Sequence, residues 1–173
     1  MDDIDPDLYM GRGTFAQVGT LAQPLLQDVA ITHITAFPTH TLFNVGAPDT
    51  VQTPGFIFAN SIVVAGSSPV TSTGSGLYTN CARDQNPLKT INKCFSNYQF
   101  SFNAILDSPL SPSDWPNGNF FYSTSTIGFV NYNNGNGGDY HLLPSSPAVG
   151  AASDGKNLGA DVDPVLNAIK GVR

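Results

Sequence analysis

The sequence predicts an all-β chain folded as a short solenoid, with a loop-rich cap at its C-terminal end. The first reason is composition: all thirteen acidic residues are Asp, there is no Glu, and the chain contains 17 Gly and 13 Pro. Asp, Gly and Pro favour turns, whereas Glu favours helices. The other two reasons are a regular spacing of short apolar runs and a turn-rich tail in which apolar residues continue.

The apolar runs are rich in β-branched and aromatic residues and are separated by turn formers, as expected of strands. They occupy residues 29–37, 55–64, 98–106, 119–122 and 127–130. The step from Ile31 to Phe58 equals that from Phe102 to Phe129, and the step between these pairs is longer because it includes a loop bracketed by cysteines. A period in the twenties is typical of a β-solenoid with one coil per repeat. A β-sandwich stays open as the alternative, because short strands and Gly-rich turns also suit it.

The tail from Asp139 to Asp163 is dense in turn formers, yet apolar residues such as Leu142, Val149 and Leu158 recur in it. A disordered segment would lack that apolar repeat, and a helix would not tolerate so many Gly and Pro residues. We therefore predict a single domain in which residues 27–138 form the coils and residues 139–173 cap the end of the stack. Residues 1–26 are expected to cover the other end or to associate with another subunit.

Charge and hydropathy exclude several classes of protein. The net charge is −6 with only seven Lys and Arg residues, so a nucleic-acid partner is not expected. No apolar run is long enough for a transmembrane helix, and the acidic N-terminus does not have the pattern of a signal peptide.

Cys81 and Cys94 are the only cysteines. Paired as a disulfide in an oxidising compartment, they would close a polar loop and contribute on the order of 3 kcal/mol to stability. Two unrelated thiols are the alternative, and two Cys without further ligands do not make a zinc site.

Several motifs resemble the C-terminal part of the right-handed parallel β-helix family, the pectate-lyase-like superfamily, as found in secreted bacterial repeat proteins of unassigned function. The resemblance covers roughly residues 14–165 and rests on Thr32-His33-Ile34-Thr35, Phe56–Val63, Phe100–Ile105, Trp115–Phe121 and Asp139–Asp163. It implies a right-handed parallel β-helix of about four or five coils, an extracellular or periplasmic location and a polysaccharide partner.

Asn60 and Asn103 are candidates for a hydrogen-bonded ladder at the bends, although ordinary turn formation explains them equally well. The chain departs from the family pattern at Ile34 and Ser61, where Asn is expected. These departures weaken the ladder and any site built on it.

Three functions follow from the resemblance and the residues. The first is a carbohydrate-associated module without complete catalytic machinery. The second is a hydrolase or lyase that uses Asp and His on a coil face. The third is a structural module that forms a homo-oligomer through exposed coil ends. Fold alone does not choose among them.

The residues expected to carry catalysis are His33, His40 and Asp49, because an exposed His beside Asp can act as a base. Solvent-exposed or bend-capping histidines are the competing interpretation. The paired Asp residues of polysaccharide hydrolases are not visible, and no Gly-x-Ser-x-Gly elbow is present.

Aromatic and acidic residues suggest two binding sites. Trp115, Tyr98 and Tyr122 are candidates for stacking on sugar rings, with packing under loops as the alternative for Trp115. Calcium is the cofactor that the acidic tail suggests. It would be held by oxygen atoms of Asp154, Asn157, Asp161 and Asp163. A tight capping turn in which these Asp residues accept backbone hydrogen bonds explains the same pattern.

Overall fold

Strands dominate the chain. The computed structural model describes residues 13–19, 26–46, 52–72 and 81–171. The strands are β1 (Thr14–Gly19), β2 (Ala30–Thr32), β3 (Thr35–Ala36), β4 (Thr41–Gly46), β5 (Thr53–Pro54), β6 (Ile57–Ala59), β7 (Ile62–Val64), β8 (Val70–Thr71), β9 (Phe95–Ser96), β10 (Gln99–Ser101), β11 (Ala104–Leu106), β12 (Phe120–Tyr122), β13 (Phe129–Asn131) and β14 (Asp139–Leu142). The helices are α1 (Pro87–Cys94), α2 (Val162–Ile169) and two 3-10 turns, η1 (Pro112–Asp114) and η2 (Asn133–Gly135).

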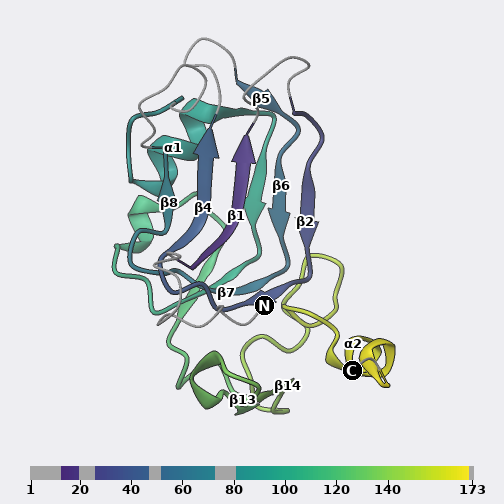
Figure 1. Cartoon of the computed structure of the whole chain (residues 1–173). Helices are drawn as coiled ribbons and strands as arrows, with labels where there is room; N and C mark the ends of the chain where they lie inside the picture. Colours follow the sequence, from purple (N-terminus) through teal and green to yellow (C-terminus); the bar gives the residue numbers. More distant parts are fainter. Residues whose placement is uncertain (1–12, 20–25, 47–51, 73–80, 172–173) are drawn as a thin grey trace.

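Four of the sheets are parallel. Their orders are β1-β4-β8, β2-β6-β10, β3-β7-β11-β12 and β5-β9. Only β13 and β14 pair in the antiparallel sense among the described strands. Figure 1 shows the longer strands running side by side, with α1 on one side. Residues 127–171, here called the C-terminal segment and drawn from green to yellow, lie below them.

Residues paired between neighbouring parallel strands are separated in the sequence by the predicted repeat length. Thr14 pairs with Thr41 and Ala30 with Ile57, and each pair has the same sequence separation as Ile31 and Phe58. The hydrogen bond from Ile34 to Ser61 spans this separation too, |i−j| = 27. The predicted spacing between the first two runs is therefore confirmed.

The next repeat is longer because it includes α1. Phe58 pairs with Phe100, and the hydrogen bond from Ser61 to Asn103 has the same separation, |i−j| = 42. An insertion between strands thus lengthens the repeat without changing which strands pair.

The second predicted spacing, from Phe102 to Phe129, is wrong. β11 pairs instead with β12, where Ala104 lies opposite Phe120. This step is much shorter, and the hydrogen bond between Asn103 and Asn119 repeats it, |i−j| = 16. Phe129 belongs to the antiparallel β13–β14 pair, outside the parallel register.

An inner core lies between the sheets and is built largely from aromatic side chains. Phe43 and Phe58 are fully buried with ring centroids 4.8 Å apart, and Phe58 lies 5.1 Å from Phe100. Val63 and Ile105, at the middle of β7 and β11, also point into this core. Mutual burial of these side chains supplies the main driving force for folding.

A row of polar side chains crosses the bends beside this core. The Asn119 side chain accepts a hydrogen bond from the Asn103 amide at 3.0 Å, and the Asn103 Oδ1 atom accepts from the Ser61 N–H at 3.2 Å. The Ser61 Oγ atom in turn accepts from the Ile34 N–H at 3.3 Å. The ladder thus runs through Asn119, Asn103 and Ser61 and ends at Ile34, which has no polar side chain. Asn60 lies beside this row and bonds elsewhere.

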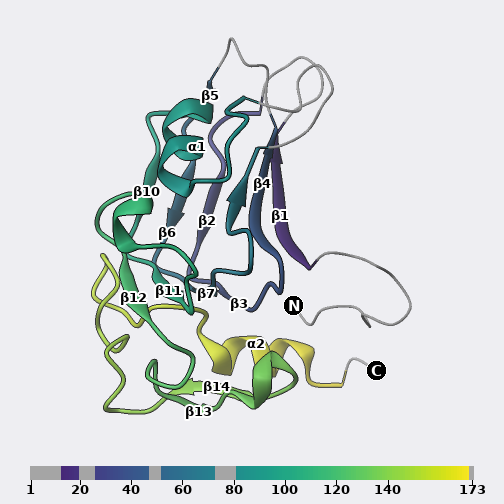
Figure 2. The same ribbon diagram turned by 90° about the vertical axis from the view of Figure 1, so that its left-hand side faces the viewer.

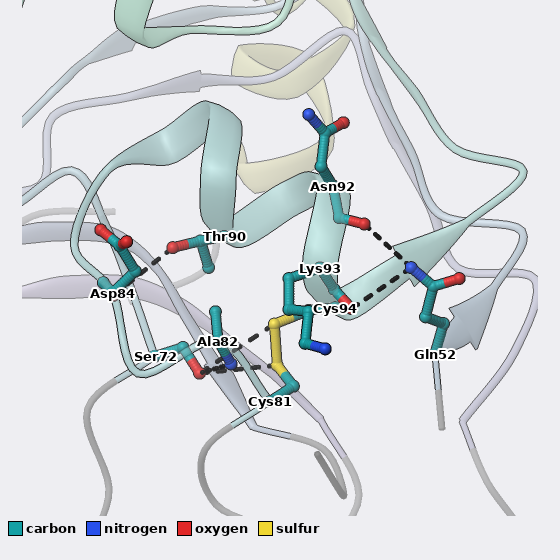
Figure 3. The surroundings of a disulfide bond; sticks show 9 residues. All are labelled: Gln52, Ser72, Cys81, Ala82, Asp84, Thr90, Asn92, Lys93 and Cys94. Atoms are coloured by element: carbon teal, nitrogen blue, oxygen red, sulfur yellow. Dashed lines mark hydrogen bonds between the residues drawn. A yellow bond between two sulfur atoms is a disulfide. The ribbon is translucent and has the colours of Figure 1, made fainter. Parts of the chain in front are cut away.

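The predicted disulfide between Cys81 and Cys94 is present, with the two Cα atoms 5.3 Å apart. Figure 3 shows it against α1, where the Gln52 amide donates to the carbonyl of Asn92 at 2.9 Å. The sequence predicts a polar loop here, but the structure has a helix. Asn86 caps its first turn by accepting from the Lys89 N–H, and a Pro at the first helical position suits that start.

The C-terminal segment forms a second core against the outer face of the sheet β3-β7-β11-β12. Ile62 on β7 and Leu106 on β11 point outward and contact Ile127, Ala148 and Leu158 of the segment. The sequence predicts a cap over the end of a stack; these contacts instead lie on a sheet face. Figure 2 shows β3, β7, β11 and β12 in a row with the C-terminal segment beneath them.

No helix in the described ranges has the length and apolar character needed to cross a lipid bilayer.

Candidate functional site

A groove of about 620 Å³ lies between the β3–β7 edge and the C-terminal segment. Its strand side is formed by His33, Thr35 and Ile62, and its other side by Tyr140 and by residues of the tail from 156 to 163. Titratable, amide and aromatic side chains gather around this groove, and we take it as the candidate site.

His33 reaches the groove because the backbone bends sharply at this residue. Its φ of 50° is in the left-handed region, between β2 and β3. Asn60 and Phe102 hold the same kind of bend in the next two repeats, with φ of 58° and 56°. Asn and His adopt this conformation more often than other side chains do, whereas bulky Phe102 is held there by the strands on either side.

The His33 side chain meets an acidic partner from the tail, and a lysine of the tail contacts the same carboxylate. Its Nε2 atom lies 3.3 Å from Oδ2 of Asp154, and the Lys156 ammonium lies 3.4 Å from the same oxygen. Partial desolvation acts to raise the pKa of Asp154, but hydrogen bonds from Lys156 and the nearby positive charges lower it below its ordinary value.

Backbone hydrogen bonds hold the tail at this edge. The Asn60 side chain accepts from the Ser153 N–H at 2.9 Å, and the Thr35 hydroxyl accepts from the Ala160 N–H at 3.0 Å. Gly159 has φ of +83°, and a Cβ atom added to it would lie 2.6 Å from the Thr35 hydroxyl oxygen. Only glycine permits this close approach.

His141 bridges two carboxylates at the far wall. Its Nδ1 atom lies 2.5 Å from Asp139 of β14, and its Nε2 atom lies 3.2 Å from Asp163 in the first turn of α2. The hydrogen bond to Asp139, followed by that to Asp163, raises the pKa of His141, and the same contact lowers the pKa of Asp139. A ring with both nitrogens facing carboxylates is suited to be a protonated tether and not a base.

The four residues predicted to bind calcium are brought to one segment but not to one point. Asp154 engages His33 and Lys156, the Asn157 oxygen accepts from the Gly150 N–H at 3.0 Å, and Asp163 engages His141. Asp161 precedes α2 and makes no capping bond with its side chain. Within the described ranges, no group of three or more His, Cys, Asp or Glu side chains is placed to hold a metal ion. The donor set therefore does not fit calcium as it lies here.

The three residues predicted to be catalytic are not assembled into one site. His33 lies in the groove, whereas the His40 ring contacts the Ser67 hydroxyl at 2.7 Å beside a different hollow. Asp49 lies outside the described residues.

The aromatic residues predicted to stack on sugars do not form an exposed row. Trp115 is 1% exposed, donates its indole N–H to Ser108 and packs near Phe100, so its ring offers no open face. Tyr98 is partly buried against the inner core, which raises its pKa, and Tyr122 packs against the second core.

His141 and Lys156 line the groove although the sequence patterns assigned them no role. A signal was available for His141: it follows Asp139 by two residues in a strand, which places both side chains on one face. No pattern in the sequence signals Lys156, because its position at the groove is evident only once the tail is folded against the sheet.

Comparison of the chain with family models, curated proteins and solved structures gives no match.

Proposed function

We propose that the chain is a carbohydrate-binding module carried on a short right-handed parallel β-helix of the pectate-lyase-like kind. Parallel pairing with one constant register in three different sheets supports one coil per repeat. A continuous aromatic core between those sheets is what stacked coils would enclose.

The observation that carries the binding proposal is the groove beside His33. Sugar hydroxyls both donate and accept hydrogen bonds, and Asn157, Asp161, Lys156 and His33 offer both kinds of partner along one hollow. Tyr140 packs on one side against Phe37 and Phe129, and the part of its ring that lines the groove can contact the apolar face of a sugar. A concave site with a few convergent polar groups is the usual form of a small-ligand site.

A neutral oligosaccharide is the preferred ligand. Carboxylates of Asp161 and Asp163 line the groove, and the chain carries a net charge of −6. An acidic polysaccharide would be repelled by both. The disulfide supports an extracellular or periplasmic setting, where such ligands occur and thiols are oxidised.

Titration of the chain with neutral gluco-, xylo- and manno-oligosaccharides, followed by NMR, tests the proposal. The resonances of Tyr140 and His141 should shift in a saturable way. Asp161→Asn should weaken binding about tenfold, the effect of losing one charge-assisted hydrogen bond. The matched control is Asp107→Asn, an exposed Asp outside the groove. Absence of any shift near the groove at about 10 mM sugar would overturn the assignment.

Self-association is a second candidate, favoured by an apolar surface on α2. Val165, Leu166 and Ile169 are 51%, 50% and 56% exposed. In the described part of the chain, β1, β2 and β3 also pair on one side only, which leaves strand edges open. Sedimentation velocity of the full chain, compared with Leu166→Ser, distinguishes the surfaces: a dimer lost in the variant would implicate α2, and a dimer retained would implicate the strand edges.

A further inference from the structure

A second hollow, distinct from the groove, lies beside the bend that precedes β4. Its volume is about 390 Å³, and Phe37, Val64 and Tyr132 give it an apolar lining. Ser67 and Asp107 are among its polar residues. Phe37 and Tyr132 contact each other edge to face, with ring centroids 5.2 Å apart, so this part of the wall is well packed.

Ser67 lines this hollow, and its hydroxyl group contacts a histidine ring. Nδ1 of His40 lies 2.7 Å from Oγ of Ser67, although the two residues are 27 apart in the sequence. That separation equals the register of the parallel sheets, and backbone bonds fix it. The Ser68 N–H donates to the His40 carbonyl at 2.8 Å, and the His40 N–H donates to the Gly13 carbonyl at 3.1 Å.

Gly66 gives Ser67 its exposed position. Its φ is +77°, and a Cβ atom added to it would lie 2.5 Å from the His40 carbonyl oxygen. The turn therefore needs glycine, and it leaves Ser67 exposed next to the hollow. Within the described ranges, the backbone N–H of Ser67 donates to no acceptor.

We propose that Ser67 and His40 form a nucleophile–base pair that hydrolyses small neutral acyl esters in this hollow. A nucleophile within hydrogen-bond reach of a base is the geometric requirement for such chemistry. The apolar wall suits a short acyl chain, and the Asp107 carboxylate disfavours an anionic one. The activity goes beyond the proposed sugar binding and rests on different residues.

The steps balance without any co-reactant except water. In the tautomer with its proton on Nε2, His40 accepts the Ser67 proton at Nδ1 while Oγ forms a bond to the ester carbonyl carbon. The carbonyl oxygen gains negative charge beside the Ser67 N–H, which can donate to it. The bond to the alcohol then breaks, and the alcohol leaves with the proton from His40.

Water next attacks the acyl group on Ser67, giving one proton to His40. The bond between the acyl carbon and Oγ then breaks, His40 returns this proton to Oγ, and the carboxylic acid is released. The chain lacks the Gly-x-Ser-x-Gly elbow, but the Gly66–Ser67 turn also leaves a serine exposed, through the positive φ of Gly66.

The test is hydrolysis of p-nitrophenyl acetate by the full chain, together with labelling by a fluorophosphonate and mass spectrometry of the labelled peptide. Ser67→Ala and His40→Gln should each lower the rate about 100-fold or to the background, the contribution typical of a catalytic nucleophile or base. The control is Ser125→Ala, an exposed serine in a separate Ser–Thr cluster, which should keep the full rate. Thermal melting of each variant checks folding.

Label on the peptide that contains Ser67, lost in Ser67→Ala, would support the pair. Equal rates in Ser67→Ala and Ser125→Ala, or a label elsewhere only, would overturn it. Neither result bears on oligosaccharide binding in the groove, so the two proposals fail separately.

Discussion

The inner core and helix α2 at the C-terminal end are held in different ways. Phe43 and Phe58 in the inner core have no exposed surface, and aromatic rings contact one another through the sheets. In the segment, α2 has no buried residue, and Asp163 bonds to His141 at an exposed position. Apolar burial stabilises strongly, whereas exposed polar contacts contribute little. The core therefore determines global stability, and α2 can be released without unfolding it.

The largest effect should follow from a cavity in the inner core. Phe58→Ala should lower the free energy of unfolding by about 3–5 kcal/mol, because the side chain is fully buried between Phe43 and Phe100. Urea denaturation followed by circular dichroism measures the change. Val130→Ala on β13, where the side chain is 50% exposed, should cost less than about 0.5 kcal/mol. Similar costs for the two variants would refute the view that burial in the inner core determines global stability.

Removing the disulfide should have the next largest effect. Both cysteines are buried in the inner core, and the bond joins positions with a sequence separation of 13. The double variant Cys81→Ala/Cys94→Ala should lose about 3 kcal/mol, since the unfolded chain gains the freedom that the bond removes. The urea midpoint under non-reducing conditions reports this loss. A midpoint equal to that of the parent chain would mean that the bond does not constrain the unfolded state.

Sequence patterns predicted the strand register where burial alone sets the pattern. The spacing of Ile31 and Phe58 reappears as strand register, because inward apolar residues must recur once per repeat. The prediction was wrong for α1, because its residues were assigned to a polar loop. Asn86 and Pro87 are nevertheless typical of a helix start.

The position of the tail was missed for a different reason. Val63 and Ile105 face the inner core, yet Ile62, Val64, Ala104 and Leu106 beside them are apolar too. An apolar run without alternation indicates a strand covered on both faces. That signal predicts a covering layer over β7 and β11. The groove itself depends on single contacts, such as Ala160 with Thr35, that no pattern encodes.

A smaller, local effect should follow from loosening the tail at Asn60. Asn60→Gly keeps the left-handed backbone and removes the acceptor for the Ser153 N–H. Hydrogen exchange at Ser153 should speed up about fivefold, the equivalent of one hydrogen bond of about 1 kcal/mol. Amides in β6 and β10 should keep their protection. Asn97→Gly, a second left-handed Asn, is the matched control and should leave Ser153 protected.

The smallest effect is a dependence of α2 on pH. The pKa of His141 is raised by the hydrogen bonds to Asp139 and Asp163, so the contribution of this tether is complete below the ordinary histidine pKa of about 6.5. It should disappear as the pH rises through the higher pKa of the folded state, because a neutral ring has only one N–H for two carboxylates. Asp139 limits the tether at acidic pH. Its pKa is lowered, so its contribution to stability persists until the pH falls through that lower value.

NMR shifts of α2 amides, followed from about pH 5 to pH 9, measure the release of the helix. The change should follow the titration of the His141 ring, weaken at high salt because the three groups are exposed, and vanish in His141→Asn. β6 and β10 amides should not follow it. A titration of α2 that persists in His141→Asn would show that another group controls the helix. An inner core that shifted together with α2 would mean that the segment and the core unfold as one unit.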